Sequence, residues 1–362
     1  MLKFKSYLKS IWIIYNNLKI LPVRKNNSKS DYKFRINYGG ARKGNMGGPL
    51  VKVSRLQEFF PQTHTKIDLL YCLSNTPYLT ERTLLSIKQK NIPIILNQNG
   101  VYFAGWYGQG WEKQNKKLIP AYKISDYVFW QSEFCKDSAE EFLGKRSGPG
   151  EVLYNAVDLT RFKPTAQIGK RNFTFLVSGK FTKAHFYRIE AAVRSFYFLQ
   201  KKDKDTNLII AGLADKEIYK LVLALVNELK INKKIRIIGK YSQANAPAIY
   251  NLSDAYVMLK YMDASPNVVA EAMACGLPVI YSATGGVKEL VGNDAGIGLG
   301  MKQDWSISPV APNLEKVTEA MRDILSQHEK YSLAARSRAI KLFDLEKWIN
   351  KHKEVFNRYV KH

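Results

Sequence analysis

The residue types best suited to chemistry in this chain stand together in one segment, Asp263 to Val279, which reads Asp-Ala-Ser-Pro-Asn-Val-Val-Ala-Glu-Ala-Met-Ala-Cys-Gly-Leu-Pro-Val. Ser265 is a favourable N-cap, Pro266 is a favourable first residue of a helix, and Gly276 is typical of the position just after a helix ends. A helix start offers unpaired backbone N–H groups and a partial positive charge, which together bind phosphate well. The segment therefore predicts a helix whose first turn can hold a phosphate group.

Two carboxylates flank this predicted helix start. Glu271 follows Pro266 by five residues, or about 7.5 Å along the axis at about 1.5 Å per residue. That separation is close to the distance between a diphosphate and the ribose hydroxyls of a nucleotide. Asp263, before the helix, can accept hydrogen bonds from sugar hydroxyls, so the pair can hold a nucleotide sugar at both ends. Taken alone, a residue such as Glu271 is more often a solvated helix residue, and one such as Asp263 is more often a turn residue.

This segment resembles a known protein family. The spacing from Asp263 to Glu271, the Ala-Cys-Gly-Leu-Pro-Val that follows, the motif at Thr284–Val291 and the segment Tyr154–Asp158 are similar to signature regions of the retaining GT-B glycosyltransferases of family GT4, the glycosyl transferases group 1. The resemblance is strong over residues 150–300 and weak in the N-terminal half. It implies transfer of a sugar from a nucleotide-diphosphate donor with retention at the anomeric carbon, without a metal and without a cofactor.

The resemblance also implies roles for individual residues. Glu271 would hold the ribose, Asp263 would contact the donor sugar, and backbone groups would hold the phosphates. The backbone positions concerned are Ser265, Asn267 and Val268. The family usually has Glu where this chain has Asp263, so the carboxylate is kept on a shorter side chain.

A basic motif after the strand predicted at Phe173–Val177 would neutralise the leaving diphosphate. The family shows Gly-Arg followed by Lys-Gly, and here Gly179-Lys180 is followed by His185 in the place of the Lys. Fixed positive charge is needed there because negative charge develops on the departing phosphate. Lys180 is therefore expected to be one cation, with Lys183 or Arg188 as the second. For any single Lys, the alternative is a solvated surface charge.

Two segments of the first half are candidates for contacts with substrate. The glycine-rich stretch from Asn37 to Pro49, which includes Gly40, resembles the family's loop facing donor phosphate and acceptor, although a flexible surface loop is the alternative. The stretch from Asn97 to Trp111 combines amides with aromatic rings, which suits a sugar because rings stack on sugar faces while amides bind hydroxyls. The acceptor would contact Asn99, Tyr102 and Trp106. Aromatic packing in the core is the competing explanation.

Short apolar runs alternate with helical patterns along both halves of the chain, which is typical of parallel sheets covered on both faces. We expect an α/β protein of the GT-B class, with two Rossmann-like, doubly wound domains facing each other across a cleft. The expected parts are a basic amphipathic segment (1–30), an acceptor-side domain (31–160), a nucleotide-sugar domain (161–340) and a C-terminal helix packing back toward the first domain (341–362). The expected strands are Tyr32–Asn37, Ile67–Leu73, Ile92–Leu96, Tyr127–Trp130, Glu151–Tyr154, Phe173–Val177, Asn207–Ala211, Ile235–Ile238, Ala255–Leu259 and Pro278–Tyr281.

Charge indicates a polyanionic partner. The net charge is +25, and residues 1–60 hold thirteen Lys and Arg against two acidic residues. Apolar residues at three- and four-residue spacing predict an amphipathic helix that ends near Pro22, with a polar linker over Arg24–Ser30. Such a helix suits an anionic membrane surface, while packing against the protein itself and a charge without any partner are the alternatives. Nucleic acid is a less favoured partner.

The sequence also bears on the expected cellular location and on whether a metal site is expected. No apolar run approaches the length of about 18–20 residues that a membrane span needs, and no secretory cleavage pattern follows the basic N-terminus. The three cysteines and five histidines show no metal-ligand spacing, so we expect no metal site and a cytoplasmic protein, peripheral at most on the inner membrane face. Cell-envelope polysaccharide or lipid-linked glycan synthesis is the favoured role. The alternatives are a nucleic-acid-binding or nucleic-acid-glycosylating protein, and a GT-B scaffold without activity.

Overall fold

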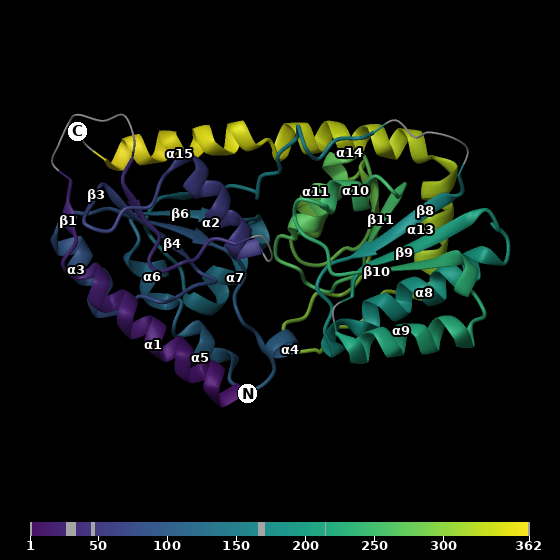
Figure 1. Ribbon diagram of the computed structural model, residues 1–362, viewed down its shortest axis with the longest axis horizontal. Helices are drawn as coiled ribbons and strands as arrows, with labels where there is room; N and C mark the ends of the chain where they lie inside the picture. The colour runs from purple at the N-terminus through teal and green to yellow at the C-terminus, as the bar shows by residue number, and fades with distance from the viewer. Residues whose placement is uncertain (1, 27–33, 45–47, 166–170, 214, 361–362) are drawn as a thin grey trace. The chain divides into compact units, whose positions relative to one another are not determined.

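Parallel strands alternate with helices along the chain and, in the described residues, form two large sheets and one separate pair of strands (Figure 1). The computed structural model describes residues 2–26, 34–44, 48–165, 171–213 and 215–360. The chain divides into two units, of which the first comprises Met1–Tyr154 with Glu346–His362 and the second comprises Asn155–Leu345.

The first unit is built on a five-stranded parallel sheet in the order β2-β4-β5-β6-β7. These strands are β2 (Ile36–Asn37), β4 (Leu69–Leu73), β5 (Ile94–Gln98), β6 (Tyr127–Trp130) and β7 (Gly150–Val152). Every residue of β4, β5 and β6 is buried, as expected for parallel strands covered on both faces. A second pair, β1 (Arg24–Lys25) with β3 (Lys66–Ile67), extends the unit at the segment predicted to be a linker. Residues 27–30 of that predicted linker lie outside the described residues.

Helices cover this sheet and one of them comes from the end of the chain. They are α1 (Leu2–Ile20), α2 (Gly48–Phe59), α3 (Glu81–Gln89), α4 (Ala104–Tyr107), α5 (Trp111–Asn115), α6 (Ile119–Ile124), α7 (Glu133–Leu143) and α15 (Leu345–Tyr359). From α15, Phe356 packs edge-on against Tyr71 of β4, and buried His352 bonds the Tyr71 hydroxyl at 2.8 Å. The C-terminal helix is therefore part of the core of the first unit.

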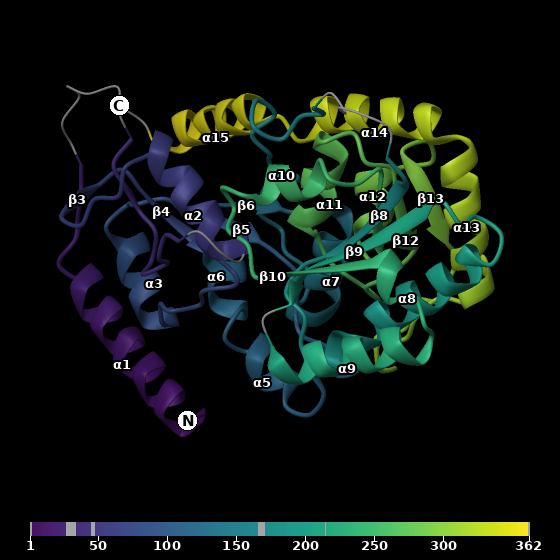
Figure 2. The same cartoon turned by 45° about the vertical axis from the view of Figure 1, so that its right-hand side comes forward.

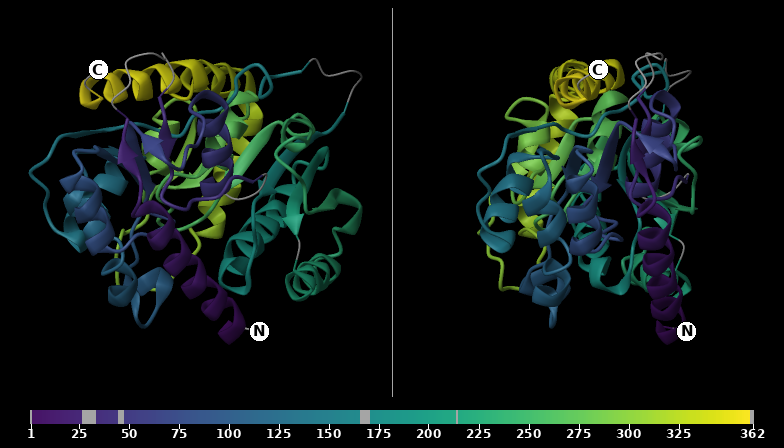
Figure 3. Two further views of the ribbon diagram at one scale, coloured as in Figure 1. Left: turned by 60° about the vertical axis from the view of Figure 1, so that its left-hand side comes forward. Right: turned by 90° about the vertical axis from the view of Figure 1, so that its left-hand side faces the viewer.

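The predicted amphipathic helix is present as α1 and ends at Ile20. It attaches to the first unit mainly through polar groups: Trp12 Nε1 donates to the Gly40 carbonyl at 3.2 Å, and Asn17 Nδ2 donates to the Tyr78 carbonyl at 2.8 Å. The N-terminal end of the helix projects beyond the strands of its unit (Figure 3). Part of its apolar surface is consequently left exposed.

The second unit holds a six-stranded parallel sheet in the order β10-β9-β8-β11-β12-β13. The strands are β8 (Phe173–Ser178), β9 (Thr206–Leu213), β10 (Ile235–Gly239), β11 (Ala255–Met258), β12 (Val279–Ser282) and β13 (Gly296–Leu299). The chain moves outward from β8 to β10, returns to the other side of β8 as β11, and continues outward to β13. The sheet is therefore doubly wound, with its switch point between β8 and β11.

Two groups of helices pack on the second sheet. They are α8 (Phe186–Gln200), α9 (Lys216–Glu228) and α13 (Leu314–Ser326) in one group, and α10 (Ala246–Tyr250), α11 (Asn267–Ala274), α12 (Val287–Val291) and α14 (His328–Leu342) in the other. Figure 2 shows α8 and α9 side by side along the strands, with α11 and α12 on the opposite side. Residues such as Phe175, Phe196 and Met321 form the core between the sheet and the first group.

The expected strands are present with small shifts at their ends. The strand expected at Tyr32–Asn37 is described only as β2, because residues 32 and 33 lie outside the described part of the chain. The expected Glu151–Tyr154 strand ends earlier, at Val152, because β7 is an edge strand paired on one side. Strand β13 was not predicted, since its sequence Gly-Ile-Gly-Leu lacks the run of β-branched residues typical of strands.

Candidate functional site

The carboxyl ends of β8 and β11 form the switch point of the second sheet, the usual place for a ligand in an open α/β sheet. Gly179 and Lys180 follow β8, while Lys260 and Asp263 follow β11. Sequence reasoning expected Gly179, Lys180 and Asp263 to act together, and the pairing of these two strands brings their loops to one edge.

Helix α11 begins at this edge, one residue later than predicted. Pro266 is the extended N-cap residue, with φ −76° and ψ 116°, and Asn267 is the first helical residue. The expectation that Ser265 caps the helix is wrong: no side chain in the described structure caps α11, and the Ser265 hydroxyl lies 3.4 Å from Asn155 Nδ2 instead. The Asn267 Oδ1 atom is buried without a hydrogen-bond partner among the described residues. An uncapped helix start of this kind can bind an anion through its backbone.

Glu271 lies one turn into α11 and is 94% buried, with a relative exposure of 6%. Its Oε1 accepts a hydrogen bond from Gln243 Nε2 at 2.8 Å, and its Oε2 accepts one from the Tyr250 hydroxyl at 2.9 Å. The simple explanation of a solvated helix residue is therefore wrong. Each carboxylate oxygen has two acceptor positions, so a held carboxylate can still accept from further hydroxyls.

Asp263 forms an ion pair that the sequence interpretation missed. Its Oδ2 lies 2.6 Å from the ammonium of Lys260, and both side chains are partly buried. Met262 between them has a φ of 51°, an uncommon conformation for a bulky residue, and its N–H donates to Thr284 Oγ1 at 2.9 Å. A Cβ at Gly285 would lie 2.5 Å from the Asp263 carbonyl oxygen. The Gly-Gly motif therefore allows the close approach that holds this loop.

Arg188 of α8 is a buried cation beside the β8 loop. Its Nη2 donates to the Lys180 carbonyl at 3.2 Å, and its guanidinium lies 4.4 Å from the ring centre of Phe181. Burial lowers its pKa, although an arginine remains charged at neutral pH, and its Nε has no hydrogen-bond partner in the described structure. A buried guanidinium with an unused donor is well suited to receive an anionic ligand.

The pKa of His185 depends on the charges of this cluster. Burial first, and then the positive charges of Arg188 and Lys260, lower its pKa to about 4, while Asp263 acts in the opposite direction. Lys180 also lowers the pKa of His185, by a smaller amount. The ring is thus neutral at physiological pH, and the pattern of effects places several cations and one carboxylate around it.

Lys183 lies apart from this cluster. Its side chain is 81% exposed and its ammonium lies 3.4 Å from Glu217. Of the two candidates for the second cation, the structure therefore buries Arg188 beside the Lys180 loop and leaves Lys183 in solvent. Lys260 is a third cation, which its position three residues before Asp263 could have indicated.

The aromatic segment of the first unit forms an exposed platform. The rings of Tyr102 and Trp106 stack with their centres 5.5 Å apart at 23°, and Trp106 is half exposed. Buried Asn115 holds the loop by bonding both the N–H and the carbonyl of Tyr102. The backbone N–H of Asn99 donates to Ser74 Oγ at 2.9 Å, which fixes Asn99 at the carboxyl end of β5. Tyr102 and Trp106 also pack against Phe103 and Tyr107, so aromatic packing within the loop accounts for part of the arrangement, and Trp106 keeps an exposed ring.

A buried lysine near these residues escaped the sequence interpretation. Lys52 of α2 donates to Asn97 Oδ1 at 2.7 Å, and Gln131 Nε2 donates to the same oxygen at 2.7 Å. Burial lowers the Lys52 pKa to about 7, with a smaller contribution of the same sign from Arg55 and an opposing one from Cys135. Its position in a helical run of mixed residues carried no signal that it would be buried.

The glycine-rich stretch after β2 lies against α1. A Cβ at Gly40, whose φ is +85°, would lie 2.5 Å from the side chain of Asn16. Residues 45–47 of this stretch lie outside the described residues. The close backbone approach expected at Gly40 is therefore made to α1.

Part of the sequence is similar to that of known proteins. Residues 160–338, nearly the whole second unit, match the family described as glycosyl transferases group 1. N-acetyl-alpha-D-glucosaminyl L-malate synthase of Bacillus anthracis is 28% identical over 141 residues, which are 39% of this chain and 35% of that protein. D-inositol 3-phosphate glycosyltransferase of Mycobacterium sp. (strain JLS) is 27% identical over 145 residues, 38% of this chain and 32% of that protein. The chain thus matches about a third of the length of these curated relatives.

Solved structures match far more of the chain. Sucrose-phosphate synthase of Thermosynechococcus elongatus has a TM-score of 0.67 at 17% identity, covering 92% of this chain and 87% of that one. HepE of Anabaena in complex with UDP has a TM-score of 0.64 at 14% identity, covering 86% and 82%. The chain has the GT-B fold.

Within this GT-B protein, the described residues contain no group of three or more His, Cys, Asp or Glu side chains placed to hold a metal ion. No described helix combines the length and the apolar character that crossing a bilayer requires.

Proposed function

We propose that this GT-B protein is a retaining glycosyltransferase that moves a sugar from a nucleotide-diphosphate donor to a glycan or lipid-linked acceptor. The observation that carries the proposal is the meeting of Lys180, Arg188, Lys260 and Asp263 with the uncapped start of α11 at the switch point of the second sheet. The match of residues 160–338 to glycosyl transferases group 1 supports this proposal, and so does the resemblance of the sequence to family GT4.

Each part of the site has a role in this proposal. Backbone N–H groups of Ser265, Asn267 and Val268 bind the donor phosphates, and Glu271 accepts hydrogen bonds from the ribose hydroxyls. Asp263 orients the donor sugar. On the acceptor side, Tyr102 and Trp106 stack on a sugar ring and Asn99 binds its hydroxyls. Gly179 allows the backbone after β8 to approach the donor closely, whereas the close approach at Gly40 is to α1.

The reaction needs charge rather than a covalent protein group. The acceptor hydroxyl oxygen forms the new bond to the anomeric carbon, and the bond from that carbon to the diphosphate breaks. The hydroxyl proton passes to the departing diphosphate oxygen on the same face of the sugar. Lys180 and Arg188 stabilise the charge that develops on the diphosphate, and fixed cations of this kind supply what a metal would otherwise provide. Positioning of the two substrates supplies much of the remaining effect.

The proposed setting is the assembly of cell-envelope polysaccharide or lipid-linked glycan, with the protein docked on the inner face of the membrane. The exposed apolar residues of α1, among them Ile14 at 60% and Leu18 at 64%, together with the net charge of +25, support docking on anionic lipid.

The experiment is a thermal-shift screen of nucleotide-diphosphate sugars, followed by transfer assays with the best donor. A donor that binds the native state raises the Tm, and NMR of the product should show the donor's anomeric configuration. An inverted product would overturn the retaining mechanism. Stabilisation without transfer to any glycan or lipid-linked acceptor would favour a silent scaffold, and a salt-sensitive gel shift would favour nucleic acid.

A further inference from the structure

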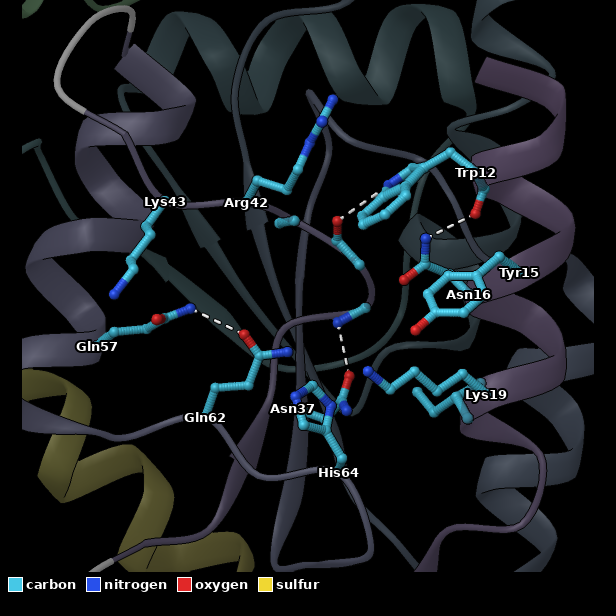
Figure 4. Close-up of a pocket in the computed structure, with 14 residues that line it drawn as sticks. Trp12, Tyr15, Asn16, Lys19, Asn37, Arg42, Lys43, Gln57, Gln62 and His64 are labelled. Atoms are coloured by element: carbon cyan, nitrogen blue, oxygen red, sulfur yellow. Dashed lines mark hydrogen bonds between the residues drawn. The ribbon is translucent and has the colours of Figure 1, made fainter. Parts of the chain in front are cut away.

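The first unit contains an open cavity of about 500 Å³ between α1 and the loop that follows β2 (Figure 4). Helix α1 forms one wall with Trp12, Asn16 and Lys19, and the loop forms another with Arg42. Gly40 has no Cβ and therefore packs closely against the side chain of Asn16. Trp12 also donates a hydrogen bond to the Gly40 carbonyl, and these two contacts hold the walls together. The cavity therefore exists only because α1 packs on the unit.

The charge around this cavity has one sign. Its cationic residues are Lys19, Arg42 and Lys43, and none of the described residues that line it is acidic. Lys19 extends from α1 toward His64 (Figure 4), and after burial its positive charge is the second cause of a lowered His64 pKa. Arg42 stacks on Trp12 with 4.9 Å between the guanidinium and the ring centre. The cavity is suited to an anion.

The floor of the cavity adds neutral hydrogen-bonding groups. Gln57 Nε2 donates to Gln62 Oε1 at 2.9 Å, which orients the two amides (Figure 4). The Gln57 carbonyl and the Gln62 amino group are thereby aligned for a ligand with hydroxyl groups. Asn37 is held by Gly39 N–H at 2.9 Å and by the Thr63 carbonyl at 3.0 Å.

An apolar stripe runs along α1 beside the cavity. Leu8, Ile11, Tyr15 and Leu18 follow each other at three- and four-residue spacing, so they lie on one face of the helix. Their side chains are 49%, 45%, 48% and 64% exposed. Tyr15 belongs to both features, since it also lines the cavity and contacts Trp12 with ring centres 5.7 Å apart. A basic cavity that opens beside an exposed apolar stripe matches a molecule with an anionic head and an apolar tail.

We propose that this cavity binds the phosphate head of a membrane-anchored amphiphile, with the apolar tail lying along the stripe of Leu8, Ile11, Tyr15 and Leu18. The inference rests on the proposed function in one respect, because it makes this amphiphile the lipid-linked acceptor or its carrier. The head is held by Lys19 and Arg42 with His64, and the amides of Gln57 and Gln62 contact hydroxyls near the phosphate. Charge complementarity selects the head, and the exposed stripe selects the tail.

The test measures binding without any sugar donor. Dodecyl phosphate, kept below its micelle concentration, is titrated into the full-length protein by calorimetry, with inorganic phosphate and dodecyl maltoside as partial probes. We expect dodecyl phosphate to bind at least about tenfold more tightly than either, because each probe lacks one half of the interaction. Equal affinity for dodecyl phosphate and inorganic phosphate would overturn the tail assignment, and equal affinity for dodecyl maltoside would overturn the phosphate assignment.

Matched variants locate the site. Lys19→Ala and Arg42→Ala should each weaken dodecyl phosphate binding by about tenfold, the loss of one charged hydrogen bond. Lys9→Ala removes the same charge from the same helix outside the cavity lining and should change binding less than about twofold. Ile11→Ser should weaken dodecyl phosphate but not inorganic phosphate, whereas Ile340→Ser, an equally exposed change on α14, should affect neither. Identical effects of Lys9→Ala and Lys19→Ala would overturn the site.

The His64 ring gives a readout that is independent of catalysis. Bound phosphate adds negative charge beside the ring, so NMR titration should show the His64 pKa rising when dodecyl phosphate is present. An unchanged His64 titration with saturating dodecyl phosphate would overturn the site. Donor stabilisation by nucleotide sugars reports on the second unit and remains intact in that case, so failure of this inference is distinguishable from failure of the proposed function.

Discussion

The hydroxyl of Tyr250 donates a hydrogen bond of 2.9 Å to Oε2 of Glu271, inside the second unit, where both side chains are buried. Gln243 holds the other carboxylate oxygen at 2.8 Å. A carboxylate held on both sides keeps one orientation before any ligand arrives, so less conformational entropy is lost on binding. This relationship turns Glu271 into a preorganised acceptor at the start of α11.

The first prediction concerns the charge of Glu271. We expect Glu271→Gln to weaken binding of the nucleoside diphosphate of the donor found by thermal shift by about 1.5–3 kcal/mol, the range for hydrogen bonds to charged groups. Calorimetric titration of the folded variant measures the effect. Glu319→Gln, at an exposed position of α13, is the control and should leave the affinity unchanged. If the two variants bind nucleotide equally well, Glu271 does not contact it.

The second prediction separates Lys180 from Lys183. Lys180→Ala should lower kcat by roughly ten- to a hundredfold and change KM less, because leaving-group charge is greatest in the transition state. Lys183→Ala should change kcat by less than about twofold, since its ammonium is in solvent beside Glu217. Steady-state kinetics with the donor identified by thermal shift decides between them. A loss of activity in Lys183→Ala as large as in Lys180→Ala would show that Lys183 turns inward on binding.

The third prediction concerns His185, whose pKa is lowered to about 4 by burial and by the cations near it. In NMR titrations of the free protein, the ring should stay neutral from pH 5.5 to 7.5. A nucleoside diphosphate bound at this site would neutralise part of the surrounding positive charge, so adding the one that belongs to the identified donor should raise the His185 pKa. His328 is the first residue of α14 and bonds the Asp254 carbonyl. Its resonance serves as the internal control. A midpoint near 6.5 in the free protein would contradict the cation cluster.

The fourth prediction concerns buried Lys52, whose pKa is lowered to about 7 from 10.5. Between these values the unfolded chain keeps a proton that the folded protein has released. Unfolding then takes up a proton, and the free energy of unfolding should rise with pH by up to about 1.4 kcal/mol per unit above pH 7. Lys52→Met should lose this part of the slope in urea denaturation at pH 7.5, 8.5 and 9.5, whereas exposed Lys202→Met should keep it. Equal slopes in Lys52→Met and the wild type would refute the assignment.

The fifth prediction concerns membrane docking by α1. The double variant Ile14→Ser/Leu18→Ser should reduce co-sedimentation with phosphatidylglycerol vesicles while the Tm stays nearly constant, because both side chains are exposed. Binding by the unaltered protein should weaken as salt rises, since a Debye length of about 8 Å at physiological ionic strength limits the attraction of each Lys. Leu333→Ser on α14 is the matched control, with 66% exposure. Equal binding to neutral and anionic vesicles would defeat the electrostatic part.

The sequence alone predicted the α/β class and most of the strands, because local apolar patterns indicate them. Apolar runs such as Tyr127–Trp130 are found as buried parallel strands at the predicted positions, and the Asp263-to-Glu271 spacing identified the region that matches glycosyl transferases group 1. Strands and helix ends depend on residues that are close together in the sequence, so hydrophobic periodicity and capping residues can predict them. Two local features differed from the prediction: strand β13 was not predicted, and Pro266 rather than Ser265 is the N-cap of α11.

Only the tertiary structure decided which charged groups share a site. Lys183 and Arg188 are equal candidates for the second cation in the sequence, but the structure buries Arg188 beside the β8 loop and leaves Lys183 in solvent. Lys260 joins the site because β11 pairs with β8, a contact between strands that are far apart in the chain. The exposure of the apolar face of α1 likewise depends on Asn16 and Asn17 packing inward. The burial of these charged and polar side chains is set by contacts between residues far apart in the chain, which a local pattern does not report.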